Sequence, residues 1–275
     1  EVTLSDSYPM TISMPAEEEG PEEVVITISH PGMSLLASGS AEETRYDFTA
    51  PELSVELTEM KGAATADADV KMSFKLTEAA GNYIVTGAAD KKALSSNVSA
   101  AAMDIVASGS STEGDAPGSF ALNAKIADLT GTSTGTLAGE MTDMAAAIKA
   151  GFSSDADFTY GAGSYDIAVT DPTGDMKIIG STEGGSLSFT MGAGGLGYGG
   201  TGKKVSLTAS GAQIPFPELK VSYAESAFNF LMPVVAGDAP SDFALLTKLV
   251  DVTISEEIWA MFDPTAQLPR DPMTV

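Results

Sequence analysis

A stretch of seventeen residues occurs twice in this chain, and this repeat constrains the fold more than any other feature. Gly114–Thr130 reads GDAPGSFALNAKIADLT and Gly237–Thr253 reads GDAPSDFALLTKLVDVT, with ten identical positions at a constant offset of 123 residues. That offset is too long for one turn of a solenoid, whose repeats run to about 20 to 50 residues. The repeat therefore predicts an internal duplication into two like-built units, residues 1–151 and 152–275, joined in one continuous sheet.

Apolar and polar residues alternate along much of the chain, the pattern of strands with one buried face. Residues 70–77 read VKMSFKLT, with every second side chain apolar. Turns are expected at His30-Pro31-Gly32 and Ala50-Pro51-Glu52, where hairpins would join the flanking strands. Further short strands are expected at 24–29, 33–37, 46–49, 53–57, 83–86, 97–100 and 103–107. We predict a mostly β protein: two homologous antiparallel β-meander repeats that form an elongated curved sheet or an open half-barrel.

Two segments depart from the strand pattern and predict short helices near 140–150 and 256–262. Glu140–Ala150 (EMTDMAAAIKA) is rich in helix formers and stops at Gly151. Glu256–Phe262 (EEIWAMF) follows Ser255, a residue suited to the N-cap, and begins with two glutamates at the positive end of the helix dipole. Each segment comes after its copy of the repeated stretch. Each unit is therefore expected to end in a short helix that caps the sheet.

The composition excludes several classes of partner and site. The net charge is −24, from 38 acidic and 14 basic residues, so nucleic acid and anionic lipid headgroups are repelled. No apolar run approaches the 18 residues of a membrane span. There is no cysteine, so disulfides and thiolate metal sites cannot form, and a single histidine excludes zinc sites built from His and Cys. A solvated surface, a basic partner and adventitious calcium binding remain open readings of the acidity.

Two motifs resemble catalytic or cofactor loops but lack the required context. Gly197–Lys203 resembles a phosphate-binding loop, yet Lys204 replaces the Ser or Thr, and a strand pattern replaces the helix. Gly131–Gly135 fits the GxSxG pattern, yet no histidine follows to act as the base. We interpret both as surface loops. His30 is expected to be solvated in its turn, and the acidic pairs Asp67/Asp69 and Glu256/Glu257 sit in no catalytic constellation. We therefore predict no enzyme, no cofactor and no metal site.

Methionine and phenylalanine are concentrated in the apolar stretches of the expected strands. Methionine adapts to irregular shapes, so these residues either fill gaps in a core poor in aromatics or line an adaptable apolar groove. The segment Phe228–Val235 is the most hydrophobic in the chain and has the same two readings. In the groove reading, the candidate ligand-binding residues are Met72, Phe74, Phe120, Phe189, Met191, Phe228, Phe230, Met232 and Phe243.

The C-terminal part of the chain carries a family resemblance. The stretch 257–272 (EIWAMFDPTAQLPRDP), Met232-Pro233 and Asp242-Phe243-Ala244 together resemble an uncharacterised family of Gram-negative envelope proteins. That family is distantly similar to the AsmA-like envelope proteins, which build long curved sheets with an apolar interior. The resemblance implies a periplasmic location after removal of a signal peptide, and it supplies no catalytic residue. The final LPRDPMTV looks like the beginning of another strand, so the natural chain is expected to continue past Val275.

These patterns predict a periplasmic, non-enzymatic protein that binds or carries an apolar ligand in a groove of its sheet. A lipid or an acyl chain fits such a groove, because burial of each CH₂ group contributes about 0.8 kcal/mol without polar chemistry. The alternative is a structural or interaction subunit of an envelope protein complex, which would recruit its partner through a sheet edge or an acidic face.

Overall fold

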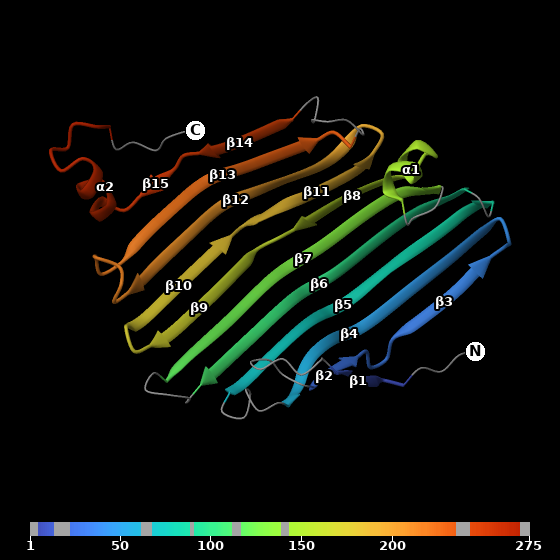
Figure 1. The fold of residues 1–275 in the computed structure, drawn as a ribbon, viewed down its shortest axis with the longest axis horizontal. Coiled ribbons are helices and arrows are strands. Elements are labelled where there is room, and N and C mark those ends of the chain that lie inside the picture. The colour runs from blue at the N-terminus through green and yellow to red at the C-terminus, as the bar shows by residue number, and fades with distance from the viewer. Residues whose placement is uncertain are drawn as a thin grey trace.

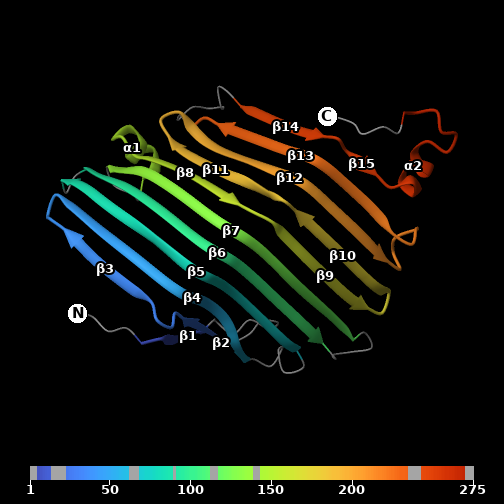
Figure 2. The same cartoon turned by 180° about the vertical axis from the view of Figure 1, so that it is seen from behind.

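The computed structural model is a single large antiparallel sheet with two short helices (Figures 1 and 2). It describes residues 5–13, 23–61, 68–88, 91–111, 117–138, 143–234 and 243–269. The sheet curves into a partial ring and is not a closed barrel. A mostly β fold with one large antiparallel sheet is confirmed.

The first half of the chain contributes seven strands, of which the last four run for 19 to 21 residues. They are β1 (Ser7–Ser13), β2 (Glu23–Ser29), β3 (Ser34–Gly39), β4 (Glu43–Lys61), β5 (Ala68–Ala88), β6 (Lys91–Ser111) and β7 (Gly118–Ala138). The second half contributes β8 (Ser153–Tyr160), β9 (Gly163–Asp171), β10 (Gly174–Thr182), β11 (Gly184–Gly192), β12 (Gly195–Gly211), β13 (Leu219–Met232), β14 (Ala244–Val250) and β15 (Thr253–Ile254).

Eight of these fifteen strands are halves of longer strands that are interrupted once. β8 and β9 both pair with β7 in one register, and β10 and β11 both pair with β12 in one register. The same holds for β14 and β15 against β13, and for β2 and β3 against β4, apart from a bulge at Val25/Ile26. The sheet is therefore a simple meander, in which each long strand lies beside the next long strand of the chain.

The interruptions fall on one line that crosses the sheet, which we call the crease. It passes through Pro51, Glu78, Ala101, Asp128, Gly161, Glu183, Lys204, Ala224 and Asp251, where the ladders lapse and then resume in the same register. Four of these non-glycine residues have a left-handed backbone: φ is 52° at Glu78, 53° at Asp128, 45° at Lys204 and 53° at Asp251. Such backbone costs about 1 kcal/mol or more for a residue with a Cβ. The crease is thus a built and strained feature of the sheet.

Both predicted hairpins in the first half are wrong, and the crease explains why. β2 and β3 flank His30-Pro31-Gly32, but they pair with β4 and not with each other. β4 continues through Ala50-Pro51-Glu52 as one strand. Turn-forming residues here bend a strand at the crease and do not reverse the chain. His30 is also buried rather than solvated, with 9% of its surface exposed, its backbone N–H bonded to the Asp6 carbonyl (2.8 Å) and its ring beside Tyr8.

The two segments predicted as loops are parts of strands. Gly131–Gly135 lies within β7, and Gly197–Lys203 lies within β12. Glycine and serine are usually depleted or neutral in strands, which is why the sequence favoured loops. In each segment one glycine, Gly131 in the first and Gly200 in the second, lies beneath an aromatic ring of a neighbouring strand, as described below.

Both short helices are present. α1 (Met144–Lys149) starts after Asp143, whose carboxylate accepts the Ala146 N–H at 3.0 Å, and Figure 1 shows it at the strand ends where β7 passes into β8. α2 (Glu256–Phe262) follows β15 as predicted, but the Ser255 hydroxyl makes no capping hydrogen bond. Within the described ranges, neither helix has the length or the apolar character needed to cross a bilayer.

The repeated stretches pair in the same way with the strand before each of them, although β7 lies inside the sheet and β14 at its edge. Their GDAP residues fall outside the described ranges, apart from Pro117, but the strands that follow them, β7 and β14, can be compared. Ile105 pairs with Ala124, and 123 residues later Phe228 pairs with Thr247. Asp128 and Asp251, also 123 residues apart, share a φ of 53° at the crease. The two stretches therefore adopt the same register against the preceding strand.

After α2, a buried carboxylate organises the C-terminal turn. Asp263, only 5% exposed, accepts the backbone N–H groups of Gln267 (3.0 Å) and Leu268 (2.8 Å). These two hydrogen bonds, together with a weaker one from Thr265, hold the pKa of Asp263 below its usual value.

We expect Asp263→Asn to weaken this turn, because the amide NH₂ cannot accept the second backbone N–H. Amide hydrogen exchange should accelerate at Gln267 and Leu268. In the parent protein, a depressed pKa means that the stabilisation is complete at neutral pH and is lost as the pH falls through the folded-state pKa. Thr265→Ala is the control, since it leaves both backbone hydrogen bonds in place. Equal exchange in Asp263→Asn and the parent protein would contradict the role of the carboxylate.

Candidate functional site: an apolar trough

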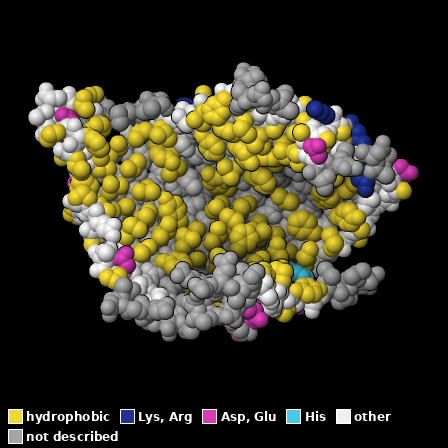
Figure 3. Space-filling view, viewed as in Figure 1, with side chains coloured by type: hydrophobic (Ala, Val, Ile, Leu, Met, Phe, Trp, Pro, Cys, Tyr) yellow, Lys and Arg dark blue, Asp and Glu magenta, His cyan; other side chains and the backbone are white. Residues whose placement is uncertain are grey.

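One face of the sheet carries most of the large apolar side chains. On β5 the side chains of Met72, Phe74 and Leu76 alternate with polar residues, and their cross-strand neighbours on β4 and β6 are also apolar. Figure 3 shows this face, with hydrophobic side chains spread over the strands and a hollow in the middle. Many of these side chains are solvent-exposed, among them Met72 (54%) and Leu187 (50%). Monomeric proteins rarely expose so large an apolar surface, so this face is the candidate binding surface.

The crease changes which residues face the hollow. Phe48 and Leu53 on β4 are five residues apart, yet both line the same depression, and so do Val98 and Met103 on β6. Strict alternation would place residues five apart on opposite faces. The alternation therefore shifts by one residue at the crease, and the apolar face continues unbroken on both sides of it.

Two depressions in this face share residues and form one continuous trough. The first has a volume of about 590 Å³ and spans β4 to β8 and β11; the second, about 440 Å³, extends to β13. Ile126, Tyr160 and Leu187 line both. The other apolar lining residues of the first are Phe48, Leu53, Leu76, Ala79, Val98, Ala100, Met103, Leu129 and Phe158. We call this combined hollow the trough.

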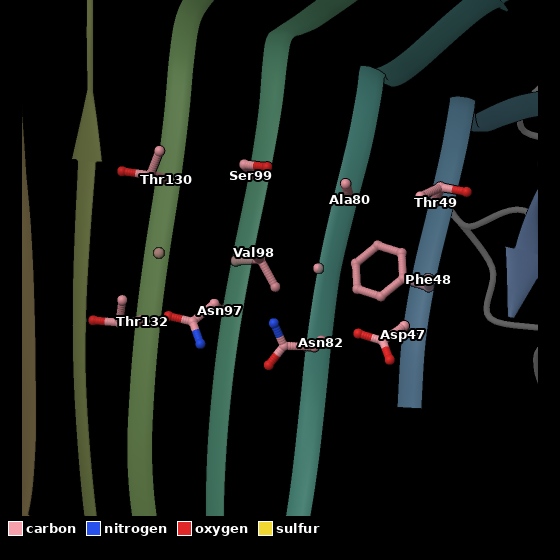
Figure 4. A pocket seen from close by; sticks show the side chains of 12 residues that line it. Asp47, Phe48, Thr49, Ala80, Asn82, Asn97, Val98, Ser99, Thr130 and Thr132 are labelled. Atoms are coloured by element: carbon pink, nitrogen blue, oxygen red, sulfur yellow. The ribbon is translucent and has the colours of Figure 1, made fainter. Parts of the chain in front are cut away.

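Aromatic rings lie against glycines of the adjacent strand throughout this face. The Phe48 ring reaches from β4 towards β5, where its cross-strand partner is Gly81 (Figure 4). A Cβ added at Gly81 would meet this ring at 2.8 Å. The other pairs of this kind are Phe120/Gly109, Phe158/Gly131, Phe228/Gly200, Tyr160/Gly185 and Tyr165/Gly180. No second layer covers the face in the described residues, so the rings pack on the bare backbone of their own sheet.

This packing predicts a measurable coupling between Gly200 and Phe228. A methyl group at position 200 would clash with the Phe228 ring, so Gly200→Ala should destabilise the protein when Phe228 is present. In a Phe228→Ala background the same change should cost much less, because the remaining close neighbour, Leu187 Cδ2 at 3.1 Å, is the end of a flexible side chain, and alanine suits a strand better than glycine. We expect a coupling energy of about 1 kcal/mol by denaturant unfolding of the double-mutant cycle. Additive effects would rule out the ring-on-glycine contact as a source of stability.

All nine candidate residues predicted from the sequence occupy this face, but the structure does not gather them into one site. Phe189, Tyr198 and Phe230 form one row across β11, β12 and β13, and Phe230 meets Phe243 edge-on with ring centroids 5.3 Å apart. Met191 and Met232 flank Leu196 in the next row, and Met72, Phe74 and Phe120 lie beyond the crease on β5 and β7. Of the nine, only Phe228 lines the trough.

The sequence missed the residues at the centre of the trough. Leu76, Val98, Tyr160 and Leu187 come from four different strands, and only the register brings them together. A search for large Met and Phe side chains passes over such positions. The one signal available in the sequence was the odd spacing of apolar residues such as Val98 and Met103, which are five residues apart on one strand. This spacing marks the shift of alternation at the crease.

The opposite face is polar and well solvated. Ion pairs join Lys75 to Glu52 (3.7 Å), and Arg45 binds Asp47 (2.6 Å), a contact that lowers the pKa of Asp47 and raises that of Arg45. A shallow depression of about 470 Å³ on the sheet is lined in rows by amide, hydroxyl and carboxyl groups of β4 to β7 (Figure 4). Among the described residues, no cluster of His, Asp or Glu could hold a metal ion. This face resembles an ordinary hydrated surface.

The comparisons with known proteins leave the trough as the main guide to function. Neither the scan against protein-family models nor the searches of curated proteins and of solved structures finds a match to this chain.

Proposed function

We propose that this chain is a non-enzymatic protein that binds or carries an apolar ligand, a lipid or an acyl chain, in the trough. The observation that carries the proposal is the pair of joined depressions, lined mostly by apolar side chains and glycine and without a charged side chain. An acyl chain in the trough would cover side chains that water now reaches, and each buried CH₂ group contributes about 0.8 kcal/mol. Apolar contact alone is thus enough for binding.

Native mass spectrometry of the gently purified protein tests this function. We expect part of the protein to carry a mass increment that extraction with organic solvent removes and that fragments as a lipid. The delipidated protein should regain the increment when incubated with a phospholipid. A protein that carries nothing after purification, and that takes up no phospholipid, would rule out the proposed function.

The periplasm of a Gram-negative cell is the setting that we propose. Its support is the resemblance of the C-terminal stretch to envelope proteins, which concerns location and fold rather than activity. Fractionation of cells that express the natural gene would test it, with the protein expected in the periplasmic fraction.

The alternative function, a structural or interaction subunit of an envelope complex, has one observation in its favour. In the described part of the chain, β14 pairs only with β13, so its outer edge is free for strand addition. Leu245 and Leu246, each 61% exposed, project to opposite sides of this edge. A pull-down that yields one stoichiometric protein partner, and no lipid, would favour this function over lipid binding.

The register of the strands supports a duplicated origin. We infer that each half is a copy of one ancestral meander followed by a capping helix, because β6–β7 and β13–β14 pair in the same register at an offset of 123 residues. In this reading each copy contributes its apolar side to the shared trough. Residues 1–151 and 152–275 are then two structural units of one sheet.

A further inference from the structure

The floor of the trough follows the crease and is made mainly of small residues. Ala50, Ala79 and Ala100 lie beside the crease on β4, β5 and β6 and are 2%, 5% and 7% exposed. In the same row, Leu129 on β7 and Tyr160 on β8 are large, and Gly185, Gly202 and Ser226 on β11, β12 and β13 are small again. Larger side chains stand in the rows on both sides. The middle row is thus small on six of its eight strand positions, and the resulting channel has its long direction across the strands.

The length of this channel is set by the number of strands that it crosses. From β4 to β13 it passes over eight strand positions, counting β8/β9 and β10/β11 as one each. With neighbouring strands about 4.8 Å apart, its contour is roughly 34 Å long. The hydrocarbon core of a bilayer is about 30 Å thick and holds two lipid tails end to end. The channel is therefore long enough for two extended tails in sequence, or for one lipid with its tails spread apart.

Charge restricts what the ends of such a ligand can carry. The residues that line the two depressions include no Asp, Glu, Lys or Arg. The ion pairs Lys125–Asp104 (3.6 Å) and Lys177–Asp166 (3.2 Å) sit on residues whose positions alternate with those lining the trough. A headgroup must therefore remain outside the trough, in the field of a chain with a net charge of −24. That field repels an anionic headgroup and attracts an amine.

These observations deepen the proposed function, on which the following inference rests. We propose that the trough takes acyl chains laid along the crease, across the strands, from a lipid whose headgroup bears an amine and no net negative charge. The uncharged floor accommodates the tails, and the acidic surroundings select the headgroup.

Competition between two phospholipids with identical tails tests the headgroup. The delipidated chain is offered equimolar phosphatidylethanolamine and phosphatidylglycerol, and native mass spectrometry counts the two bound forms. We expect at least a fivefold excess of phosphatidylethanolamine at low salt, and a smaller excess when salt screens the charges. Equal binding, or a preference for phosphatidylglycerol, would overturn the inference and leave the proposed function standing. If neither lipid binds, the proposed function itself is wrong.

Cross-linking tests the direction of the tails. Phosphatidylethanolamine with a photoreactive group at the tail end is bound, activated by light and mapped by peptide mass spectrometry. Adducts are expected beside the crease on several strands, for example at Met103, Ile126 and Val205. Adducts confined to residues along a single strand would show that the tails run parallel to the strands and would overturn the inferred direction.

Discussion

A Leu187→Glu variant is expected to lose at least tenfold in affinity for an acyl chain. Leu187 lines both depressions and is 50% exposed, so it can be replaced without disturbing a packed core. A glutamate there would place a charge in the middle of an apolar channel, and a bound chain would have to desolvate it. A tenfold loss corresponds to about 1.4 kcal/mol, a modest fraction of the cost of burying an unpaired carboxylate. Titration with phosphatidylethanolamine that carries a fluorescent group on one tail measures the change.

Ser188→Glu is the matched control for this variant. Ser188 is the next residue on the same strand and lies among the polar groups of the other face, beside Asp157. The charge change is identical, so both variants alter the long-range field equally. We expect Ser188→Glu to bind within twofold of the parent. Denaturant unfolding separately measures the small loss of stability that the like charge of Asp157, directly opposite, would cause. Equal losses in the two variants would place the binding site away from the trough.

Substitutions at the crease are expected to reverse the usual order of strand preferences. Asp128 has a φ of 53°, a conformation that glycine adopts without strain, that Asp tolerates and that a β-branched residue resists. The expected order of stability at this position is Gly, then Asp, then Ala, then Val. In denaturant unfolding, we expect the free energy of unfolding of Asp128→Val to lie about 2 kcal/mol below that of Asp128→Gly.

Asn123 provides the comparison on the same strand. It lies five residues before Asp128, in a regular part of β7 opposite Val106 and Asp166. There the ordinary strand preferences apply, so Asn123→Val should be more stable than Asn123→Gly. If both positions gave the same order of stability, the left-handed backbone at the crease would have no effect on the free energy of unfolding.

The long strands were only partly predictable from the sequence. The alternation in 70–77 correctly marked one stretch of β5, but 97–100 and 103–107 were expected as two strands and belong to the single strand β6. The reason is the shift of alternation at the crease, which makes one strand look like two. Pro51 was misinterpreted in a similar way, because a proline that bends a strand has the same local signature as one that turns the chain.

The candidate site was predictable in character but not in position. Large apolar residues at alternating positions along the expected strands predicted an apolar face, and every one of the nine candidates lies on the apolar face of the sheet. Their role in ligand binding stays a prediction. The floor of the trough, with Ala79, Ala100 and Gly202, has no sequence signal of its own. These residues can be recognised as the floor of the trough only when the register of the neighbouring strands and the position of the crease are known.

The meander has a consequence for how such a protein can change over evolutionary time. Because each long strand pairs with the next one in the chain, insertion of one more hairpin at an edge would leave every existing contact in place. Each added hairpin would extend the channel by about 10 Å, the width of two strands. Tandem duplication of a segment that encodes one hairpin can therefore lengthen the channel for longer or more numerous ligands, while the existing strands keep their sequences.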